Sequence, residues 1–353
     1  MWLVEVWRGS SVSDDLEPLS PEEGIERFLR HREPSVREST MRNARTRLRF
    51  FREWCEEREI ENLNTLTGRD LADFVAWRRG DVAAVTLQKQ LSTIREALRF
   101  WADIEGAHDG LAEKVHSIEL PDGAASRTVH LDAERAHDIL DYLGEHHYAS
   151  RDHVVMVILW RTAMRRSALR AIDVDDLQPE DHAIELKNRP DTGTKLKNGD
   201  NGERWVYLGP TWFNPIEDYL DNPDRYDVTD EHGREPLITT PNGRPTGDSI
   251  YTWVNWLTHP CKIGGCPHDR DPSDTSTCDA LGTYGSPSKC PSAVGPHAVR
   301  RGSITYHLNR NVTPELVSER CDVSLDVLYE HYDVRTNREK MEVRKDRLED
   351  SDI

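Results

Sequence analysis

His297 and Arg300, near the C-terminal end of the sequence, have the types and spacing of a phosphate-binding pair. Residues three apart share one face of a helix, and Pro296 suits the first turn of such a helix. The N-terminus of a helix favours an anion because its free backbone N–H groups point toward the ligand. About one helix pair later, Tyr332 stands in a helical pattern with polar neighbours. A histidine, an arginine and a tyrosine that converge on a phosphate predict a site for nucleophilic attack at phosphorus.

The composition sets the broad class of the protein. The sequence has 353 residues, enough for two or three domains, with a formal net charge of −18 and a pI near 5.3. Acidic residues are abundant and lysine is rare, which is typical of proteins from a high-salt cytoplasm. Salt shortens the range of charges, so the net charge describes solubility and is compatible with a nucleic-acid partner. The sequence contains no apolar run of membrane-spanning length and no signal peptide, so we expect a cytoplasmic protein without a membrane partner.

The first third of the chain has the pattern of a bundle of about four helices. Ser20 and Pro21 mark the start of the first helix, and Thr67 caps the third. The second helix is predicted over residues 36–57. The fourth is predicted over residues 86–101, where apolar residues recur at alternating spacings of four and three.

The second of these helices carries many arginines in a protein that is otherwise acidic. A basic face of this kind is the electrostatic footprint of a phosphate backbone, whereas a solvated helix surface produces the same pattern without a partner. The first interpretation predicts that this helix binds DNA. The predicted DNA-binding residues are Arg42, Arg45, Arg49 and Arg52.

The rest of the chain predicts a second domain of mixed structure. Residues 119–130 are polar and contain Pro and Gly, which is typical of a linker. Asp132 then caps a helix, and the apolar run from Val154 to Leu159 is typical of a segment that is buried on most sides. The fold class that follows is mainly α with a small β-sheet (α+β). Strands are expected over 183–186, 204–208 and 237–240, and helices over 249–257, 298–308, 314–320 and 325–332.

The order of these motifs resembles the tyrosine recombinase (phage integrase) family. Residues 162–169, Thr-Ala-Met-Arg-Arg-Ser-Ala-Leu, are similar to the first arginine box of that family. Residues 297–301, His-Ala-Val-Arg-Arg, are similar to its His-x-x-Arg box, and the Glu-His-Tyr-Asp string that ends at 333 looks most like haloarchaeal members. The resemblance covers the chain from about Glu22 to Lys340.

The resemblance implies a role for each matched residue. Arg165 and Arg300 would hold the non-bridging oxygens of a DNA phosphate, each through two N–H groups. His297 would add a hydrogen bond and manage the proton of the nucleophile. A lysine at the tip of a hairpin would protonate the leaving oxygen. Lys197 is favoured over Lys195 because Lys-Asn-Gly leads into Gly-Glu-Arg much as in the corresponding turn of the family.

Two tyrosines compete for the role of nucleophile. Tyr329 and Tyr332 are three apart on one predicted helix, so both could approach the same site. The spacing to the preceding helix favours Tyr329, whereas the His-Tyr-Asp string of the haloarchaeal relatives favours Tyr332. We select Tyr332. Its attack on a phosphodiester would give a phosphotyrosine link and a free 5′-hydroxyl.

The sequence also departs from the pattern of the family at three places. Ala163 stands where the family has Gly, and Ala168 stands where it usually has Glu. The Gly-His motif that normally precedes the last helix is replaced near Arg320 and Cys321. The sixth active-site position therefore has no assigned residue.

Four of the six cysteines crowd into one loop-like segment at residues 259–294. In a cytosolic protein this pattern indicates a metal rather than disulfides. Four soft ligands in a segment rich in Gly and Pro fit a closed tetrahedral zinc site that braces the loop. His268 is a fifth candidate donor, which could replace one of the cysteines. The predicted ligands are Cys261, Cys266, Cys278 and Cys290.

Together, these patterns predict a domain plan and a function. The family resemblance implies a site-specific recombinase that cleaves and rejoins double-stranded DNA as a homotetramer, through a 3′-phosphotyrosine and without a cofactor for catalysis. The alternative is a zinc-stabilised, non-catalytic DNA-binding regulator. The expected segments are a tail (1–18), a helical core-binding, SAM-like domain (19–118), a linker (119–130), a catalytic domain (131–343) with the cysteine insert (259–294), and an acidic tail (344–353).

Overall fold

A computed structural model of the chain divides into two compact units, Met1–Ala125 and Ser126–Ile353. Parts of the predicted tails and linker, at residues 1–15, 121–128 and 350–353, lie outside the described residues. The described residues are 16–36, 38–120, 129–271, 273–274, 276–281, 286–333 and 335–349.

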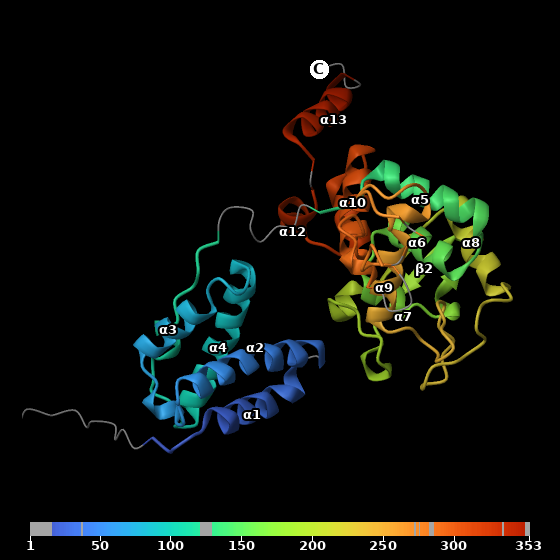
Figure 1. Ribbon diagram of the computed structural model, residues 1–353. Coiled ribbons are helices and arrows are strands. Elements are labelled where there is room, and N and C mark those ends of the chain that lie inside the picture. Colours follow the sequence, from blue (N-terminus) through green and yellow to red (C-terminus); the bar gives the residue numbers. More distant parts are fainter. Residues whose placement is uncertain are drawn as a thin grey trace, which may run out of the picture. The chain divides into compact units, whose positions relative to one another are not determined.

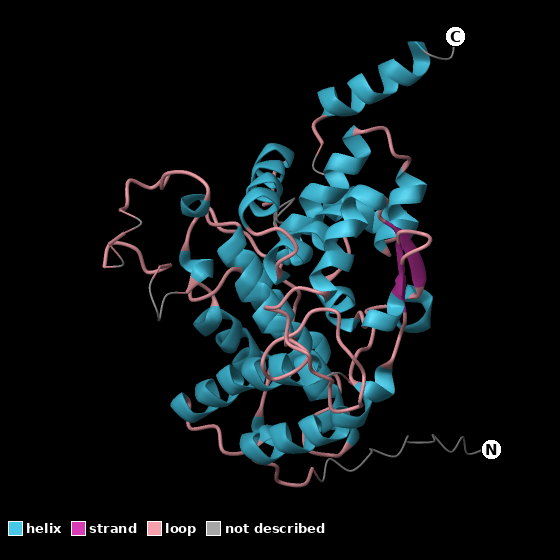
Figure 2. Cartoon of the chain, turned by 90° about the vertical axis from the view of Figure 1, so that its right-hand side faces the viewer, coloured by secondary structure: helices cyan, strands magenta, loops and turns pink. Residues whose placement is uncertain are grey.

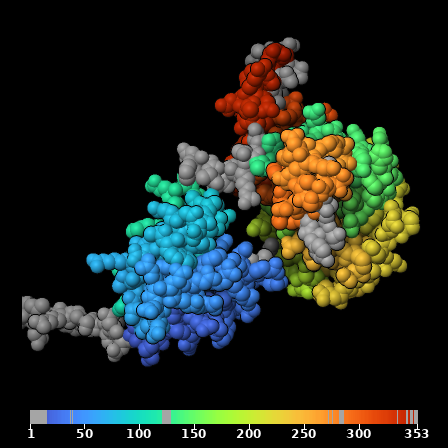
Figure 3. All heavy atoms as spheres, in the orientation of Figure 1, coloured from blue at the N-terminus to red at the C-terminus, as the bar shows by residue number. Residues whose placement is uncertain are grey.

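The first unit is the predicted helical bundle. The side chain of Ser20 accepts a hydrogen bond from the backbone N–H of Glu23, and Thr67 and Asp70 form a reciprocal capping box, so the sequence signals mark the true helix starts. Figure 3 shows its atoms, coloured blue to cyan, as one packed body. The helices are α1 (Pro21–Arg32), α2 (Glu38–Glu57), α3 (Gly68–Arg78) and α4 (Ala84–Asp103).

Aromatic side chains fill the interior of this bundle. The rings of Phe51, Trp54, Phe74 and Trp101 are buried and contact one another across helices α2, α3 and α4. The indole N–H of Trp101 donates to the carbonyl oxygen of Gly24 at 2.7 Å, so the polar end of this ring is satisfied inside the core. The unit therefore has a hydrophobic core of its own.

The second unit is built around one buried helix, α6. The predicted apolar run from Val154 to Leu159 lies in this helix, and each of its residues is at most 2% exposed. Helices α5, α8, α9 and α10 pack around α6 (Figure 1). The helices are α5 (Ala133–His146), α6 (Arg151–Thr162), α7 (Arg166–Ala171), α8 (Pro210–Leu220), α9 (Gly247–Leu257), α10 (Pro296–Asn309), α11 (Pro314–Cys321), α12 (Leu325–Val327) and α13 (Asn337–Glu349).

Helix α10 approaches its neighbours more closely than a side chain would allow at one position. A Cβ atom added to Gly302 would lie 1.8 Å from the carbonyl oxygen of Leu131 and 3.2 Å from the ring of Trp160 on α6. The absence of a side chain at Gly302 therefore lets α10 pack against the core.

A three-stranded antiparallel sheet lies beside the helices, with β1 (Leu177–Gln178) paired to β2 (Ala183–Leu186) and β2 paired to β3 (Arg204–Tyr207) (Figure 2). The predicted strands over 183–186 and 204–208 are confirmed. The strand predicted over 237–240 is wrong. That segment makes isolated bridges only at its ends, where Pro236 pairs with Asp173 and Thr240 turns back onto Gly243. The apolar residues of this segment, Leu237 and Ile238, pack into the core of the unit without pairing in the sheet, and a short buried run of this kind has the composition of a strand.

The C-terminal end also differs from the prediction. Helix α13 runs to Glu349, so the acidic tail predicted from residue 344 begins inside a helix. This helix is polar on all sides and lacks the apolar stripe on which helix prediction depends. Within the described residues, no helix is both long and apolar enough to cross a membrane.

Candidate active site

Three of the predicted catalytic residues meet at the N-terminal half of α10. Pro296 occupies the first turn of this helix, as predicted, and Arg300 lies one turn later with 1% of its surface exposed. Tyr332 ends a π-helical turn, Leu328–Tyr332, and is 5% exposed. Its hydroxyl lies 3.3 Å from Nε2 of His297, and the guanidinium of Arg300 lies over its ring, 5.0 Å from the centroid. The structure thus brings the imidazole, guanidinium and phenol together.

Arg300 has one occupied edge and one open edge. Its Nη1 donates to the carbonyl oxygens of Ala163 at 2.6 Å and Cys321 at 2.7 Å. Its Nε and Nη2 are buried and have no hydrogen-bond partner among the described residues. Leaving buried charged donors unsatisfied costs free energy, so this edge is prepared to bind an acceptor such as an anion.

The first arginine box places Arg165 beside Arg300. Helix α6 ends at Ala163 in a left-handed conformation with φ of 50°, and Arg165 then begins helix α7. Burial and the nearby charge of Arg300 lower the pKa of Arg165, while Asp322 opposes that shift. Arg165 forms an ion pair with the carboxylate of Asp322. The two guanidiniums of the predicted phosphate site are therefore neighbours that repel each other.

The segment between β2 and β3 brings one of the two candidate lysines to this cluster. Lys197 lines a small cavity together with Arg165, Arg204 and Asp322. Lys195 is also exposed, but it is not among the residues that line this cavity. The geometry therefore favours Lys197 over Lys195.

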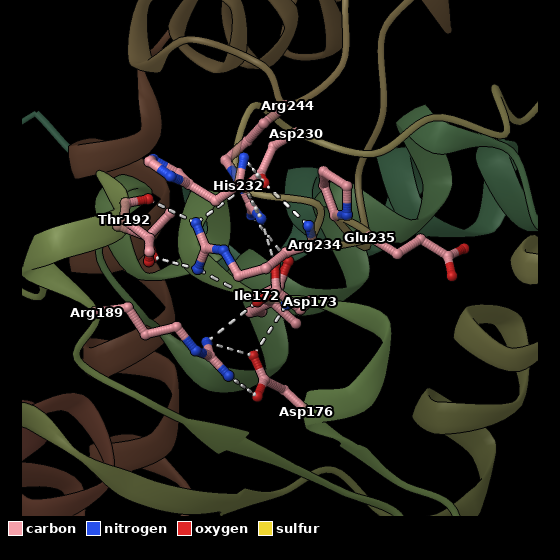
Figure 4. A network of polar contacts seen from close by, with 12 residues as sticks. Ile172, Asp173, Asp176, Arg189, Thr192, Asp230, His232, Arg234, Glu235 and Arg244 are labelled. Carbon is pink, nitrogen blue, oxygen red and sulfur yellow. Dashed lines mark hydrogen bonds and ion pairs between the residues drawn. The ribbon is translucent and has the colours of Figure 1, made fainter.

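A network of ion pairs braces the base of this lysine segment (Figure 4). Arg234 donates to the carbonyl oxygen of Thr192 at 2.7 Å and to the hydroxyl of Thr194 at 2.9 Å, both a few residues before Lys197. It also pairs with Asp230 at 2.9 Å. Burial opposes the ionisation of Asp230, but hydrogen bonds from Arg234 and Arg244 outweigh it and lower the pKa of Asp230 to about 2.

A second anchor of the segment comes from Arg189, which follows β2. Its guanidinium pairs with the buried carboxylate of Asp176 at 2.5 Å and lies 3.4 Å from Asp173 (Figure 4). Burial raises the pKa of Asp176, but the hydrogen bonds from Arg189 and Asp173 lower it by more. The part of the lysine segment that precedes Lys197 is thus fixed to the core of the unit at three residues.

The structure separates the two candidate nucleophiles. Tyr329 is 49% exposed and lines a groove with Leu308, Val312 and Arg335. Tyr332 instead faces His297. The prediction that both tyrosines could approach one site assumed an α-helix, whereas this turn is a π-helix, which has a different angular spacing.

Several residues of the site were missed from the sequence. Asp322 lies in a left-handed conformation with φ of 53° after α11, close to Arg165. Burial lowers the pKa of Arg204, and the nearby charges of Arg300 and Arg165 lower it further. Arg161 and Arg204 affect Arg320 in the same way. The side chain of Arg320 bridges the carbonyl oxygens of Tyr207 and Arg161 at 2.7 and 2.9 Å. A lone arginine or aspartate has no periodic signature, so only the spatial arrangement identifies these residues.

The described part of the cysteine segment shows no complete metal site. The thiols of Cys261 and Cys266 contact each other, whereas Cys278 and Cys290 are buried in a small cluster with Ala280. His268 instead contacts the hydroxyl of Ser292 at 3.0 Å. Among the described residues, no three His, Cys, Asp or Glu side chains are grouped so that they could hold a metal. Zinc binding remains a prediction.

The predicted DNA-binding arginines of α2 are accessible but lie near acidic side chains. Arg42 pairs with Glu38 at 3.3 Å, and Arg45 lies 3.9 Å from Glu33. Arg49 pairs with Glu53 at 3.3 Å, and Arg52 pairs with Glu56 at 3.2 Å. Exposed ion pairs of this kind contribute about 0–1 kcal/mol each, so a DNA phosphate could replace them.

Comparisons with known proteins identify the N-terminal unit. Residues 25–103 match the family described as "Phage integrase, N-terminal SAM-like domain". None of the curated proteins matches the sequence. The N-terminal domain of a phage integrase/site-specific recombinase from Haloarcula marismortui is 37% identical, with a TM-score of 0.29, over 29% of this chain and 99% of that chain.

Two solved structures are similar over nearly the whole chain. The Tn1549 transposon integrase in complex with transposon right end DNA is 15% identical, with a TM-score of 0.61, over 94% of this chain and 99% of that one. A lambda integrase dimer bound to a COC′ core site is 12% identical, with a TM-score of 0.63, over 91% and 97%. At this identity the likeness concerns the fold. Residues 25–103 form a phage-integrase SAM-like domain, and the chain as a whole has the two-domain fold of the tyrosine recombinases.

Proposed function

We propose that this protein is a site-specific DNA recombinase or integrase that cleaves and rejoins DNA through a 3′-phosphotyrosine intermediate. The observation that carries the proposal is the position of Tyr332: its hydroxyl lies 3.3 Å from Nε2 of His297, and the guanidinium of Arg300 lies over its ring, 5.0 Å from the centroid. The groups that phosphoryl transfer from DNA to a phenol requires are a nucleophile, a proton acceptor and a cation that can bind the phosphate. Arg300 can be that cation, because its buried Nε and Nη2 have no hydrogen-bond partner among the described residues.

Each residue has a defined part in the proposed reaction. The hydroxyl oxygen of Tyr332 attacks the scissile phosphorus while its proton passes to Nε2 of His297. The bond from phosphorus to the 5′ oxygen breaks, and Lys197 protonates that oxygen. Arg165 and Arg300 neutralise the charge that develops on the two non-bridging oxygens. The products are a phosphotyrosine on the 3′ end and a free 5′-hydroxyl, and rejoining reverses these steps without a cofactor.

The proposed partner is double-stranded DNA, bound by a homotetramer. In solved structures of the same fold, the Tn1549 integrase is in complex with transposon DNA and a lambda integrase tetramer is bound to a Holliday junction. The exposed arginines of α2, Arg42, Arg45, Arg49 and Arg52, would add contacts to the phosphate backbone.

A covalent-adduct assay tests this proposal. The full chain is incubated at high salt with nicked suicide duplexes whose core sequence is randomised, and DNA that becomes attached to protein is recovered under denaturing conditions and sequenced. We expect adducts with a shared core sequence. Tyr332→Phe should abolish them, because it removes the attacking oxygen, whereas Tyr329→Phe should retain them as the matched control.

The opposite results are also informative. Adducts that survive Tyr332→Phe and vanish with Tyr329→Phe would transfer the nucleophilic role to Tyr329. Specific DNA binding without adduct formation at any salt concentration would instead support a non-catalytic DNA-binding regulator.

We further propose that the cysteine segment takes up a structural zinc ion. The donor set supports this, because four thiolates are typical ligands of a closed zinc site. The contact between the thiols of Cys261 and Cys266 brings two of the donors together, and the ion would draw Cys278 and Cys290 toward them. Its last cysteine, Cys290, lies seven residues before His297, so the metal would brace the start of α10 rather than take part in the reaction.

A further inference from the structure

Asp322 is the one acidic side chain that the described residues place in contact with the arginines of the candidate active site. Its carboxylate pairs with Nη1 of Arg165 and accepts a hydrogen bond from the side-chain amide of Asn198 at 2.6 Å. Its side chain is 12% exposed. Asn198 follows Lys197 directly, so one carboxylate connects the first arginine box to the lysine segment.

The neighbouring arginines are held in a different way. Arg161 donates to the carbonyl oxygen of Leu208 at 2.9 Å, and Arg204 donates to that of Arg320 at 2.9 Å. Releasing these arginines would leave backbone carbonyls unsatisfied. The partner of Arg165 is a side chain, which can leave by changing its rotamer while the backbone stays in place. Arg165 is therefore the guanidinium in this cluster whose partner can most readily be exchanged.

The pair formed by Arg165 and Arg300 needs an anion. Burial lowers the pKa of Arg165, and the nearby charge of Arg300 lowers it further. Asp322 supplies one negative charge, but it leaves the Nε and Nη2 edge of Arg300 without a partner in the described residues. A phosphodiester has two non-bridging oxygens, so it can accept from both guanidiniums at once.

We propose that Asp322 is the resident anion of the site and occupies Arg165 until a DNA phosphate takes its place. The exchange also releases Asn198, and with it the segment that presents Lys197 to the leaving oxygen. Phosphate entry and lysine positioning are thereby coupled through one carboxylate. This inference rests on the proposed function, because it takes the incoming anion to be a DNA phosphate.

The backbone at Asp322 makes a clean test possible. Its φ of 53° is in the left-handed region, which asparagine and glycine also adopt. Asp322→Asn therefore retains the backbone and the oxygen that accepts from Asn198, and removes only the charge. Asp322→Gly removes the whole side chain at the same backbone conformation.

The test measures binding of inorganic phosphate to the full chain at fixed chloride concentration, from the shift of the unfolding temperature with phosphate concentration. We expect Asp322→Asn to bind phosphate about tenfold more tightly than the unaltered protein, because a charged competitor has been removed. Asp322→Gly should change in the same direction. Asp326→Asn removes the same charge from an exposed position of α12, so it should leave the affinity unchanged.

Two further variants show that the gain arises at this site. Adding Arg165→Ala to Asp322→Asn should remove the gain, because the arginine that the phosphate would occupy is gone. Asn198→Ala removes the hydrogen bond to the Asp322 carboxylate but keeps the carboxylate itself, so it should also strengthen phosphate binding. This variant provides the test if the Asp322 variants fail to fold. Equal or weaker phosphate binding in Asp322→Asn, or in Asn198→Ala where the former does not fold, would overturn the inference.

The phosphate measurement needs no cognate DNA, so it separates this inference from the proposed function. If no duplex formed an adduct with Tyr332, the proposed reaction would be refuted, but an increased phosphate affinity of Asp322→Asn would still support the role of Asp322. An unchanged phosphate affinity would remove the role of Asp322 while adduct formation still stood.

Discussion

Arg300 is fixed by the backbone rather than by an acidic partner. The carbonyl oxygens of Ala163 and Cys321 hold one nitrogen, and the rest of the guanidinium faces the ring of Tyr332. This arrangement leaves the positive charge uncompensated, so that it is available to an anion. It also fixes the direction of the open edge before any ligand arrives, which is the condition for strong electrostatic stabilisation of a transition state.

Replacing this guanidinium by an amine should affect the reaction more than DNA binding. In Arg300→Lys the charge remains, but a lysine cannot donate to two backbone carbonyls and to a phosphate in the same geometry. We expect the rate of adduct formation to fall by about 10²–10³-fold, the usual effect of losing one fixed donor to a transition state. Gel-shift affinity should change by less than the rate. Arg310→Lys, exposed at the end of the same helix, is the control, and an equal loss of rate there would contradict the assignment.

His307 predicts acid sensitivity of the second unit. Burial, together with the charges of Arg320 and Arg161, lowers the pKa of His307 from 6.5 to about 4. Between these two values the unfolded chain binds a proton that the folded chain does not, so stability falls as the pH falls. The loss at pH 4 is up to about 3 kcal/mol for this group. Urea unfolding between pH 4.5 and 7 should show a flatter pH dependence for His307→Gln. Parallel curves for the two proteins would show that this histidine is not responsible.

At the scale of elements, the lysine segment is held at its base and joined to Asp322 through Asn198. Arg234 and Arg189 fix the residues around Thr192 and Thr194 (Figure 4). Because these contacts lie in the interior, they are less screened by salt than the surface pairs of α2. The network should therefore depend less on salt concentration than the pairs of α2 do.

Removing the fork of Arg234 should both destabilise the unit and slow the reaction. Arg234→Lys cannot reach Thr192, Thr194 and Asp230 at the same time, and it leaves buried acceptors unsatisfied. We expect a loss of about 2–4 kcal/mol in the free energy of unfolding, somewhat less than the loss of about 3–5 kcal/mol for removing one partner of a buried ion pair, because lysine keeps the charge. Adduct formation should slow even where the protein is fully folded. Arg338→Lys, which alters an exposed pair on α13, should change neither quantity.

The cysteine segment provides a prediction about metal content. Protein purified without chelators should contain about one zinc per chain by elemental analysis, and Cys266→Ser or Cys278→Ser should lower this ratio. Chelation should lower the unfolding temperature, because structural zinc contributes about 10–16 kcal/mol to the folding of small zinc domains. Cys55→Ala removes a thiol from the core of the other unit, so it should leave the zinc ratio unchanged. A metal-free protein with the same unfolding temperature would refute the zinc proposal.

The features that could be predicted from the sequence are those that depend on neighbouring residues in the chain. Caps such as Ser20 and Thr67 and the apolar periodicity of α4 lie within a few residues of the elements they define, so these helices were predicted well. The π-turn before Tyr332 and the left-handed Asp322 depend on contacts between distant segments, so no local pattern announces them. Family motifs indicated the two arginines of the candidate active site, whereas the acidic partner of Arg165 is identified only by the three-dimensional structure.

At the scale of the whole molecule, the charge of the candidate active site has the opposite sign to the net charge of the chain. The chain has a net charge of −18, yet Arg165, Arg204 and Arg300 lie close together in the candidate active site, where Asp322 pairs with Arg165. Arg320 and Arg161 extend this group of positive charges. The negative net charge repels DNA at long range, and the positive site attracts it only at short range. Nonspecific DNA binding should therefore be weak.

Each unit has its own core, which predicts independent folding. A fragment of residues 16–120 should unfold cooperatively by circular dichroism, because Trp54 and Trp101 lie in a core formed entirely by that unit. A fragment of residues 129–353 should unfold in a separate transition. If the first fragment proved unfolded while the whole chain was folded, the two units would depend on each other for stability.

The left-handed backbone at Ala163 limits how this protein can vary. In that conformation a methyl side chain already costs about 1 kcal/mol, and a branched side chain would collide with its own carbonyl group. The carbonyl of this residue also steers Arg300, so a shift that relieved the collision would turn the guanidinium. Libraries randomised at this codon should therefore return glycine, alanine and asparagine among active clones, and exclude valine, isoleucine and threonine.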